Sequence, residues 1–208
     1  MTKTKLTAII TATLTATVLL AGCTQPAPQP TRSSTKTANP TPSADPTQTP
    51  VAAPASQQDA YLAANKTIGE FLAVDYQIQH NPSAGASAIE PFASGEALQN
   101  EQQTAAQLAR NGWSTNGGPG TWSPNASLST YGEIAVGGKT YPNAIAYMKG
   151  CLDISNQTSV TAPGHTPPTT RTATSIPVQF NVQYTPSQRV WMVTYVNNIN
   201  GKSGAPQC

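Results

Sequence analysis

The sequence predicts an α+β domain in which N-terminal helices pack on one face of a curved antiparallel β-sheet, behind a signal peptide and a disordered linker. Three observations lead to this prediction. Apolar residues recur every three or four positions over 58–113 and every second position in segments after 127. Prolines crowd the segment before them, and residues 1–22 have the layout of an export signal. Helices followed by a run of strands are typical of the α+β class.

Two helices are expected in the first part of the domain. The first carries an apolar stripe over 61–78 and ends at Asn81-Pro82, because a residue before proline is disfavoured in helical conformation. The second follows the Ser94-Gly95 break and ends near Asn111-Gly112. Its repeating positions are Ala97, Leu98, Glu101, Ala105, Leu108 and Ala109.

Strands are expected in the second part. Apolar residues alternate strictly from Ile176 to Tyr184, and a turn over 185–188 leads into an apolar strand over 190–196 that could be covered on both faces. Two further strands are predicted upstream, over 132–136 and 144–155, with Gly137-Gly138 as a hairpin turn. The Thr/Pro-rich residues 157–174 are expected to form a long exposed connection.

The N-terminus is typical of a secretory signal. Lys3 and Lys5 precede the fifteen residues 6–20, of which five are threonines. A membrane-spanning helix needs about 20 predominantly apolar residues, so this run is too short and too polar to be one. A signal peptide over 1–22 is therefore predicted.

The end of this signal, Leu20-Ala21-Gly22-Cys23, resembles the lipobox of bacterial lipoproteins. That resemblance implies that the Cys23 sulfur receives a diacylglyceryl group and that cleavage makes Cys23 the first mature residue. The expected location is then the extracytoplasmic face of the cell membrane, held by the lipid. An ordinary cleaved signal with a coincidental cysteine is the alternative.

Residues 23–57 are predicted to be the lipidated cysteine and a linker. Eight prolines share 24–57 with many Thr, Ser, Gln and Ala residues and no aromatic residue. Such a composition buries too little apolar surface to offset the entropy of ordering. The folded domain is therefore expected over 58–208, held away from the membrane by the linker.

The charge of this domain excludes one class of partner. Residues 58–208 hold eight acidic and seven basic side chains, a net charge of −1. No basic stripe is present to attract a phosphate backbone, so nucleic acid is not expected as a partner.

Two cysteines, Cys151 and Cys208, remain in the domain. In an oxidising compartment such a pair predicts a disulfide that ties the last residue to the middle of the domain. Two free thiols are the alternative. A metal site is less favoured, because no histidine or third cysteine lies at ligand spacing.

The order of elements resembles the cone-shaped fold shared by nuclear transport factor two and ketosteroid isomerase, as it occurs in secreted actinobacterial lipoproteins. The segments that carry this resemblance are PFASGEAL (91–98), RNGW (110–113), GCLDIS (150–155), VWMV (190–193) and the terminal Cys208. It spans about 58–208. The catalytic residues of the isomerases have no matching motif here, so none is assigned, and no cofactor is expected.

Two patterns resemble functional sites, a phosphate-binding loop and catalytic histidines, but neither has the features that such a site needs. VGGKTY (136–141) ends like a phosphate-binding loop, but Glu133 stands where that motif needs its first glycine. A hairpin turn explains it better. His80 ends a predicted helix and His165 lies in a loop, and neither position offers the rigid support that catalysis requires.

Carboxylates and tryptophans are the remaining candidates. Asp75, on the first helix, could act as a base if an apolar pocket raised its pKa, and Asp153 is the next such candidate. The favoured alternative is structural: Asp75 faces solvent or forms a hydrogen bond with a neighbouring tyrosine. Trp113 and Trp122 flank a Gly-rich segment and could bind a ligand or plug the open end of the sheet.

The functional hypothesis is a non-catalytic, lipid-anchored domain that binds an envelope protein or a small ligand. An isomerase-like enzyme that uses Asp75 or Asp153 as its base is one alternative. A domain that only presents surface is the other. A concave pocket with convergent polar groups and a perturbed carboxylate would be needed for the enzyme.

Overall fold

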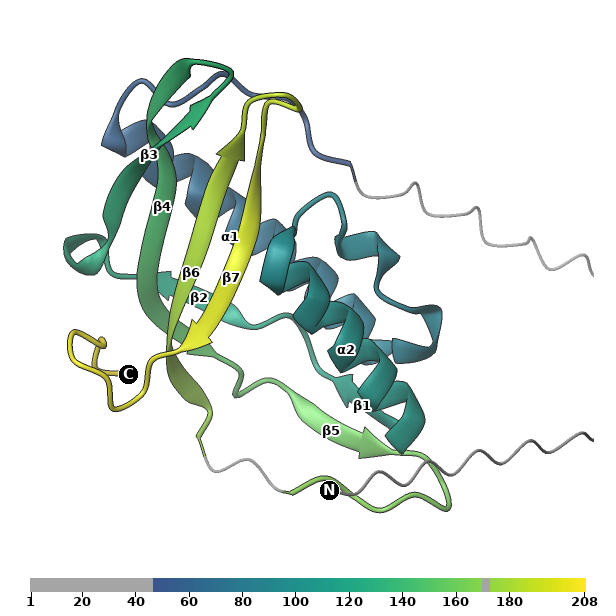
Figure 1. The fold of residues 1–208 in the computed structure, drawn as a ribbon. Coiled ribbons are helices and arrows are strands. Elements are labelled where there is room, and N and C mark those ends of the chain that lie inside the picture. The colour runs from purple at the N-terminus through teal and green to yellow at the C-terminus, as the bar shows by residue number, and fades with distance from the viewer. Residues whose placement is uncertain (1–46, 170–172) are drawn as a thin grey trace, which may run out of the picture. The chain divides into compact units, whose positions relative to one another are not determined.

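The computed structural model describes residues 47–169 and 173–208, and these form an α+β domain as expected (Figure 1). The predicted signal peptide, Cys23 and most of the linker lie outside the described residues. The helices are α1 (Gln57–His80) and α2 (Gly95–Asn111), with single 3₁₀ turns at Pro82–Ala84, Ser87–Ile89 and Ala126–Leu128. The strands are β1 (Trp113–Asn116), β2 (Thr121–Pro124), β3 (Thr130–Val136), β4 (Lys139–Asp153), β5 (Thr158–Thr161), β6 (Ser175–Thr185) and β7 (Val190–Asn198).

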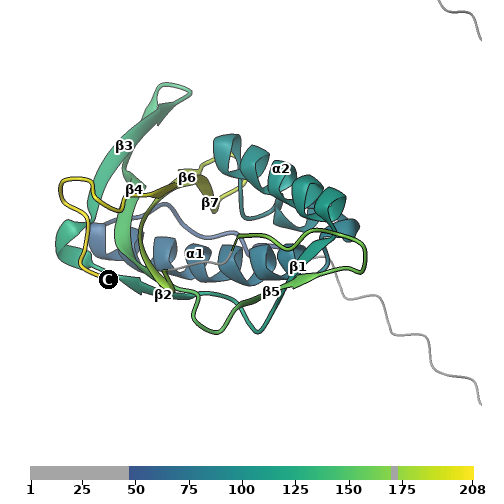
Figure 2. The ribbon, with the colours of Figure 1, turned by 90° about the horizontal axis from the view of Figure 1, so that it is seen from below.

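The main sheet is antiparallel and is organised around the long strand β4. On one side β4 pairs with β6, which pairs with β7. On the other side β3 pairs with the first part of β4 and β2 with the last part. Figure 2 shows this sheet curving around α1. The curvature brings the inward side chains of several strands onto one helix.

The core fills the space between α1 and the concave face of the sheet. Residues with little or no exposed surface come from both layers, and Phe71 of α1 meets Phe180 of β6 edge to face with ring centroids 6.2 Å apart. Trp122 of β2 also contacts Phe180, at 5.0 Å. The largest fully buried side chains are Trp191, Phe71, Phe180, Ile68, Ile89, Met148, Val182 and Val193.

Both helices begin and end where local chemistry predicts. The Ser56 side chain caps α1 by accepting a hydrogen bond from the Asp59 backbone N–H at 3.1 Å. Asn81-Pro82 ends this helix, as expected. Gly112 ends α2 in the left-handed conformation at φ 62°, which glycine adopts without the usual steric cost.

The hairpin between β3 and β4 confirms the interpretation of the VGGKTY segment. Gly137 and Gly138 have φ values of 59° and 76°, and Val136 pairs with Lys139 across them. Two successive positive φ angles define the tight turn that joins twisted strands. The segment is therefore a hairpin and not a phosphate-binding loop.

One expectation about the strands was wrong. Part of the supposed exposed connection 157–174 is β5, which pairs with β1 in a separate two-stranded sheet. The strand over 190–196 is covered more fully on one face than on the other. In β7, Trp191 and Val193 are buried on one face, whereas on the other face Val190 is buried and Met192 and Thr194 are half-buried.

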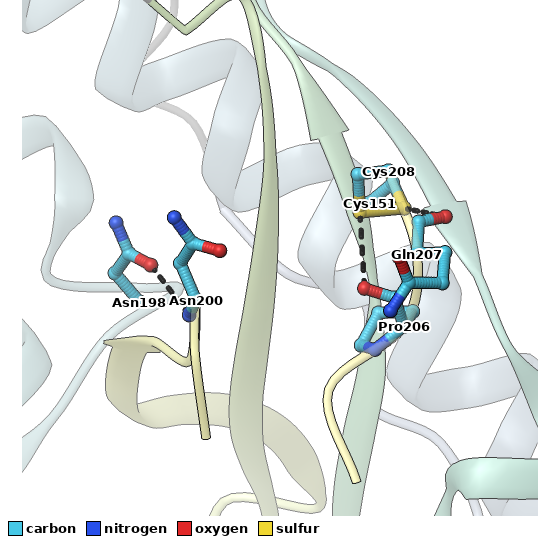
Figure 3. The surroundings of a disulfide bond; sticks show 6 residues. All are labelled: Cys151, Asn198, Asn200, Pro206, Gln207 and Cys208. Atoms are coloured by element: carbon cyan, nitrogen blue, oxygen red, sulfur yellow. Dashed lines mark hydrogen bonds between the residues drawn. A yellow bond between two sulfur atoms is a disulfide. The ribbon is translucent and has the colours of Figure 1, made fainter. Parts of the chain in front are cut away.

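The C-terminus is tied to the sheet. The structure joins Cys151 of β4 to Cys208, with their Cα atoms 5.7 Å apart, which confirms the expected pairing (Figure 3). The Ile199 backbone N–H donates to the Pro177 carbonyl at 2.9 Å, so the segment after β7 is fixed at both of its ends.

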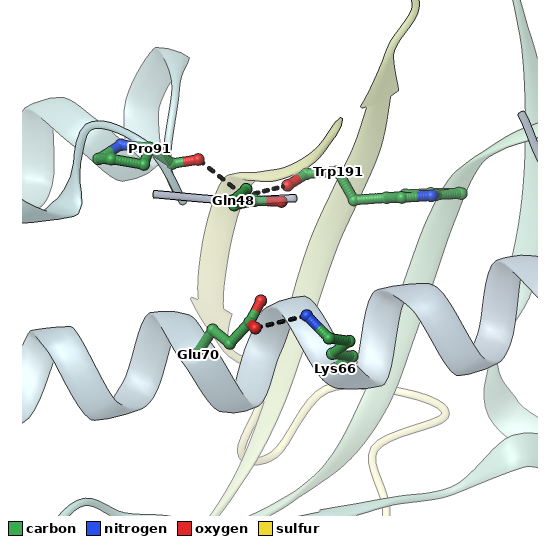
Figure 4. Close-up of polar contacts among 5 residues, drawn as sticks. All are labelled: Gln48, Lys66, Glu70, Pro91 and Trp191. Atoms are coloured by element: carbon green, nitrogen blue, oxygen red, sulfur yellow. Dashed lines mark hydrogen bonds and ion pairs between the residues drawn. The ribbon is translucent and has the colours of Figure 1, made fainter. Parts of the chain in front are cut away.

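The residues just before α1, 47–56, contact the domain along β7 and are called the strap. Gln48 Nε2 donates to the carbonyls of Pro91 and Trp191, each at 2.7 Å (Figure 4). The Val51 backbone N–H donates to the Arg189 carbonyl at 2.7 Å. Most of the strap is exposed, but Gln48 is half-buried and Pro54 is buried, so part of the segment that composition assigns to the linker is attached to the fold. Figure 4 also shows the Lys66–Glu70 ion pair on α1. Because this pair is exposed, it contributes little to the free energy of unfolding.

Candidate functional site: a carboxyl pair beside an apolar pocket

A pocket of about 440 Å³ lies between α1, the end of β4 and the start of β6. Its apolar wall comes from Leu72 on α1 and from Leu152 and Ile176, which pair across β4 and β6. A volume of several hundred Å³ is typical of pockets that take small molecules. The described residues that line it are Leu72, Asp75, Gln79, Gly120, Leu152, Ile154, Gln157, Ala173 and Ile176.

Helical spacing brings the polar groups of α1 to this pocket. Leu72, Asp75 and Gln79 are three and four positions apart, so they share one face of the helix. On this face Leu72 is buried, whereas Asp75 is only half-buried. Asp75 thus lies where the buried part of α1 meets a cavity.

Gln79 holds the Asp75 carboxylate in place. Its Nε2 donates to Oδ1 at 2.8 Å and to Oδ2 at 2.9 Å. Its Oε1 in turn accepts a hydrogen bond from the buried Thr115 hydroxyl at 3.3 Å. This chain of contacts, which runs from β1 to α1, orients the carboxylate.

Glu101 of α2 adds a second carboxyl group to the site. Burial raises the pKa of Glu101 to about 9, and the charge of Asp75 and a side-chain hydrogen bond with Asp75 contribute further. Its Oε2 atom is buried and meets no donor among the described residues. Two carboxyl groups can share a hydrogen bond only if one of them is protonated. Glu101 therefore carries a proton at neutral pH.

Sequence reasoning identified Asp75 and missed Glu101. The signal was present, because Glu101 occupies a position of the repeating stripe of α2, together with Ala97 and Ala105. An acidic residue on a buried stripe needs a partner, but the sequence does not tell which residue on another element supplies it.

The two tryptophans fit the structural alternative better than the binding one. Trp122 Nε1 donates to Asn65 Oδ1 at 3.1 Å, and its ring contacts Phe180 in the core. Trp113 Nε1 donates to the Thr166 carbonyl at 2.7 Å. Neither indole lines the pocket among the described residues, so both serve to hold loops and strands together.

The histidines and Asp153 lie elsewhere. His80 Nδ1 is 2.9 Å from the Thr115 carbonyl oxygen, and its ring stacks on Tyr76. The ring of His165 packs against Gly112, where an added Cβ would lie 2.6 Å from it. Asp153 is exposed at the end of β4, and hydrogen bonds from Ser155 lower its pKa, which is opposite to what a base at neutral pH requires.

Comparison with known proteins adds little to this geometry. No protein family and no curated protein matches the sequence. Among solved structures, the chain is similar to the crystal structure of the intermembrane space region of the chloroplast protein ARC6, at a TM-score of 0.37 and 9% identity. That similarity covers 65% of this chain and 92% of the other. A likeness at this level assigns neither a fold type nor a function to this chain.

Two further features bear on the site. Within the described residues, no helix combines the length and the apolar character needed to cross a bilayer. No group of three or more His, Cys, Asp or Glu side chains in the same part of the chain could hold a metal ion.

Proposed function

We propose that this chain is a lipid-anchored extracytoplasmic domain that binds a small molecule in the pocket beside Asp75. The observation that carries the proposal is the pocket itself, in which apolar walls surround one oriented carboxylate. A concave apolar site with few, fixed polar groups is the usual form of a small-molecule site. Two alternatives stay predictions: the domain binds an envelope protein, or it only presents a surface and binds no ligand.

The proposed fold type is the cone of nuclear transport factor two. The curved sheet around α1 (Figure 2) and the pocket between α1 and the strands support it. The family resemblance of segments 91–98 and 150–155 supports it as well.

The proposed location rests on the sequence before the domain. The lipobox-like Leu20-Ala21-Gly22-Cys23 supports a lipid on Cys23, and the Pro-rich residues 24–46 would separate that lipid from the domain. If the strap stays bound to β7, the tether is about ten residues shorter than composition suggests. The pocket would then work at the cell envelope, close to the membrane.

Binding is favoured over catalysis by the contacts of Asp75. Gln79 and Glu101 both donate hydrogen bonds to its carboxyl group. Hydrogen bonds to the charged form of a carboxylate make it a weaker base. The arrangement suits an acceptor that attracts a ligand better than it suits a base that removes a proton. An isomerase-like reaction at Asp75 is therefore the less supported function.

The test of binding is recovery of the ligand with the protein. The full chain, purified from cells that produce it, should release a small molecule on denaturation that mass spectrometry detects. Ala173→Trp places a large side chain at the exposed rim of the pocket and should abolish recovery. Ser187→Trp, in the exposed β6–β7 turn, is the matched control. Equal recovery from all three proteins would refute the proposed site.

The anchor has its own test. Cys23→Ser should release the protein from membranes or leave an uncleaved precursor, measured by fractionation and by labelling with a radioactive fatty acid. Persistent lipid labelling of the variant would show that the anchor is assigned to the wrong residue.

A further inference from the structure

We propose that the pocket selects small organic cations, with an ammonium group beside Asp75 and an apolar body against Leu72, Leu152 and Ile176. This inference rests on the proposed function, since it names the ligand class for the same pocket. Three observations support it: the polar side chains that line the pocket are mainly hydrogen-bond acceptors, the walls are apolar, and the carboxyl group of Glu101 lies next to Asp75.

The described lining offers acceptors more than donors. Its polar side chains are one carboxylate, Asp75, and the amides of Gln79 and Gln157, and no Lys or Arg is among the described lining residues. Gln79 Nε2 already donates to Asp75, and Gln157 Nε2 donates to the Gly118 carbonyl at 3.1 Å. A ligand that brings donors therefore matches this site better than a ligand that brings acceptors.

The carboxyl pair explains why the donor should be charged. Glu101 holds a proton and donates to Asp75, so the pair presents one negative charge and not two. Beside apolar walls the effective dielectric constant is low, and a charge there attracts an opposite charge more strongly than in water. An ammonium group gains this attraction, less the cost of leaving water, together with a hydrogen bond, whereas a hydroxyl group gains only a hydrogen bond.

The walls define the rest of the ligand. Leu72, Leu152, Ile154 and Ile176 surround a cavity of about 440 Å³, which is too large for an inorganic ion and suits a molecule of moderate size. The apolar part of such a molecule gains free energy when these side chains remove it from water. The expected ligand is thus an amine with a hydrocarbon or aromatic body.

The experiment compares three probes that share one body. Calorimetric titration of the full chain in nanodiscs, with empty nanodiscs subtracted, is performed with 3-phenylpropylamine, 3-phenylpropanol and 3-phenylpropionate. We expect the amine to bind at least about tenfold more tightly than the alcohol, and the carboxylate to bind more weakly than either. Equal or tighter binding of the alcohol or the carboxylate would overturn the inference.

Two variants of matched charge show whether Asp75 is responsible. Asp75→Asn should remove most of the difference between amine and alcohol. Glu70→Gln makes the same charge change on α1 at a residue that does not line the pocket, and it should preserve the difference. A preference for the amine that survives Asp75→Asn, in a protein whose melting temperature shows it to be folded, would assign the selectivity elsewhere and contradict the inference.

The outcomes separate this inference from the proposed function. If a small molecule is recovered from the wild type and lost in Ala173→Trp, but the amine has no advantage, the pocket binds ligands and the inference alone fails. If no molecule is recovered and none of the three probes binds, both fail.

Discussion

The side chain of Glu101, on α2, hydrogen-bonds to the carboxyl group of Asp75, on α1. This contact links the helix that the sheet surrounds to the helix at its side, through two groups that ordinarily repel each other. It persists because Glu101 is buried and keeps its proton. The pair combines a structural link between helices with the polar group of the candidate site.

The first prediction concerns the pH dependence of stability. The pKa of Glu101 is raised from 4.5 to about 9 in the folded state, so the folded protein holds an extra proton between these values. The resulting stabilisation is complete below about pH 4.5 and is lost as the pH rises toward 9. The free energy of unfolding should fall by up to about 1.4 kcal/mol per pH unit from this group in that range.

Glu101→Gln tests this expectation. Glutamine has nearly the same shape as the protonated acid and does not titrate, so the pH dependence of the variant should be flatter than that of the wild type. Urea unfolding of both proteins at several pH values between 5 and 9 measures it. Parallel curves would contradict a protonated Glu101.

The second prediction concerns the disulfide. Cys151 and Cys208 are separated by 57 residues, and opening a loop of this length should lower the free energy of unfolding by about 4 kcal/mol in the chain-entropy model. A protein with serine at both positions should show this loss in denaturant unfolding. Added reductant should destabilise the wild type and leave the double variant unchanged. If reductant affects both proteins alike, the loss has another origin.

The third prediction concerns the strap. Gln48→Ala removes two hydrogen bonds, to the Pro91 and Trp191 carbonyls, and should cost about 1–2 kcal/mol of stability. Gln57→Ala, at an exposed position at the start of α1, is the matched control and should cost little. Equal effects of the two substitutions on the unfolding midpoint would show that the strap does not stabilise the domain.

The fourth prediction uses two glycines with opposite surroundings. A Cβ at Gly150 would lie 2.3 Å from the Ser123 carbonyl oxygen, so Gly150→Ala should separate β2 from β4 and cost about 2–3 kcal/mol. A Cβ at Gly69, inside α1, would have no neighbour within 4 Å. Gly69→Ala should therefore stabilise the protein by about 1 kcal/mol, because alanine favours the helix. Thermal unfolding should show a lower melting temperature for Gly150→Ala and a higher one for Gly69→Ala. If both melting temperatures shift in the same direction, the packing described for these glycines is contradicted.

Local patterns were enough to predict most of the elements. The stripes of α1 and α2, the Asn81-Pro82 and Gly112 endings and the alternation in β6 are short-range features, because helix and strand periods are set by neighbouring residues. β1, β2 and β5 escaped this reasoning. Each has four residues, and the pairing of β1 with β5 joins Trp113 to Thr161 across the chain, which no local pattern encodes.

The candidate site divides in the same way. The sequence by itself determined that Asp75 stands on an otherwise apolar helical stripe. It also determined that the domain has two cysteines, Cys151 and Cys208, which can pair with each other, and that Cys23 follows a signal-like segment. Only the tertiary structure decided that Glu101 meets Asp75, that Gln79 orients it and that a pocket opens beside it. The physical reason is that a carboxyl group's proton depends on burial and on charges from other elements, and these exist only once the chain has folded.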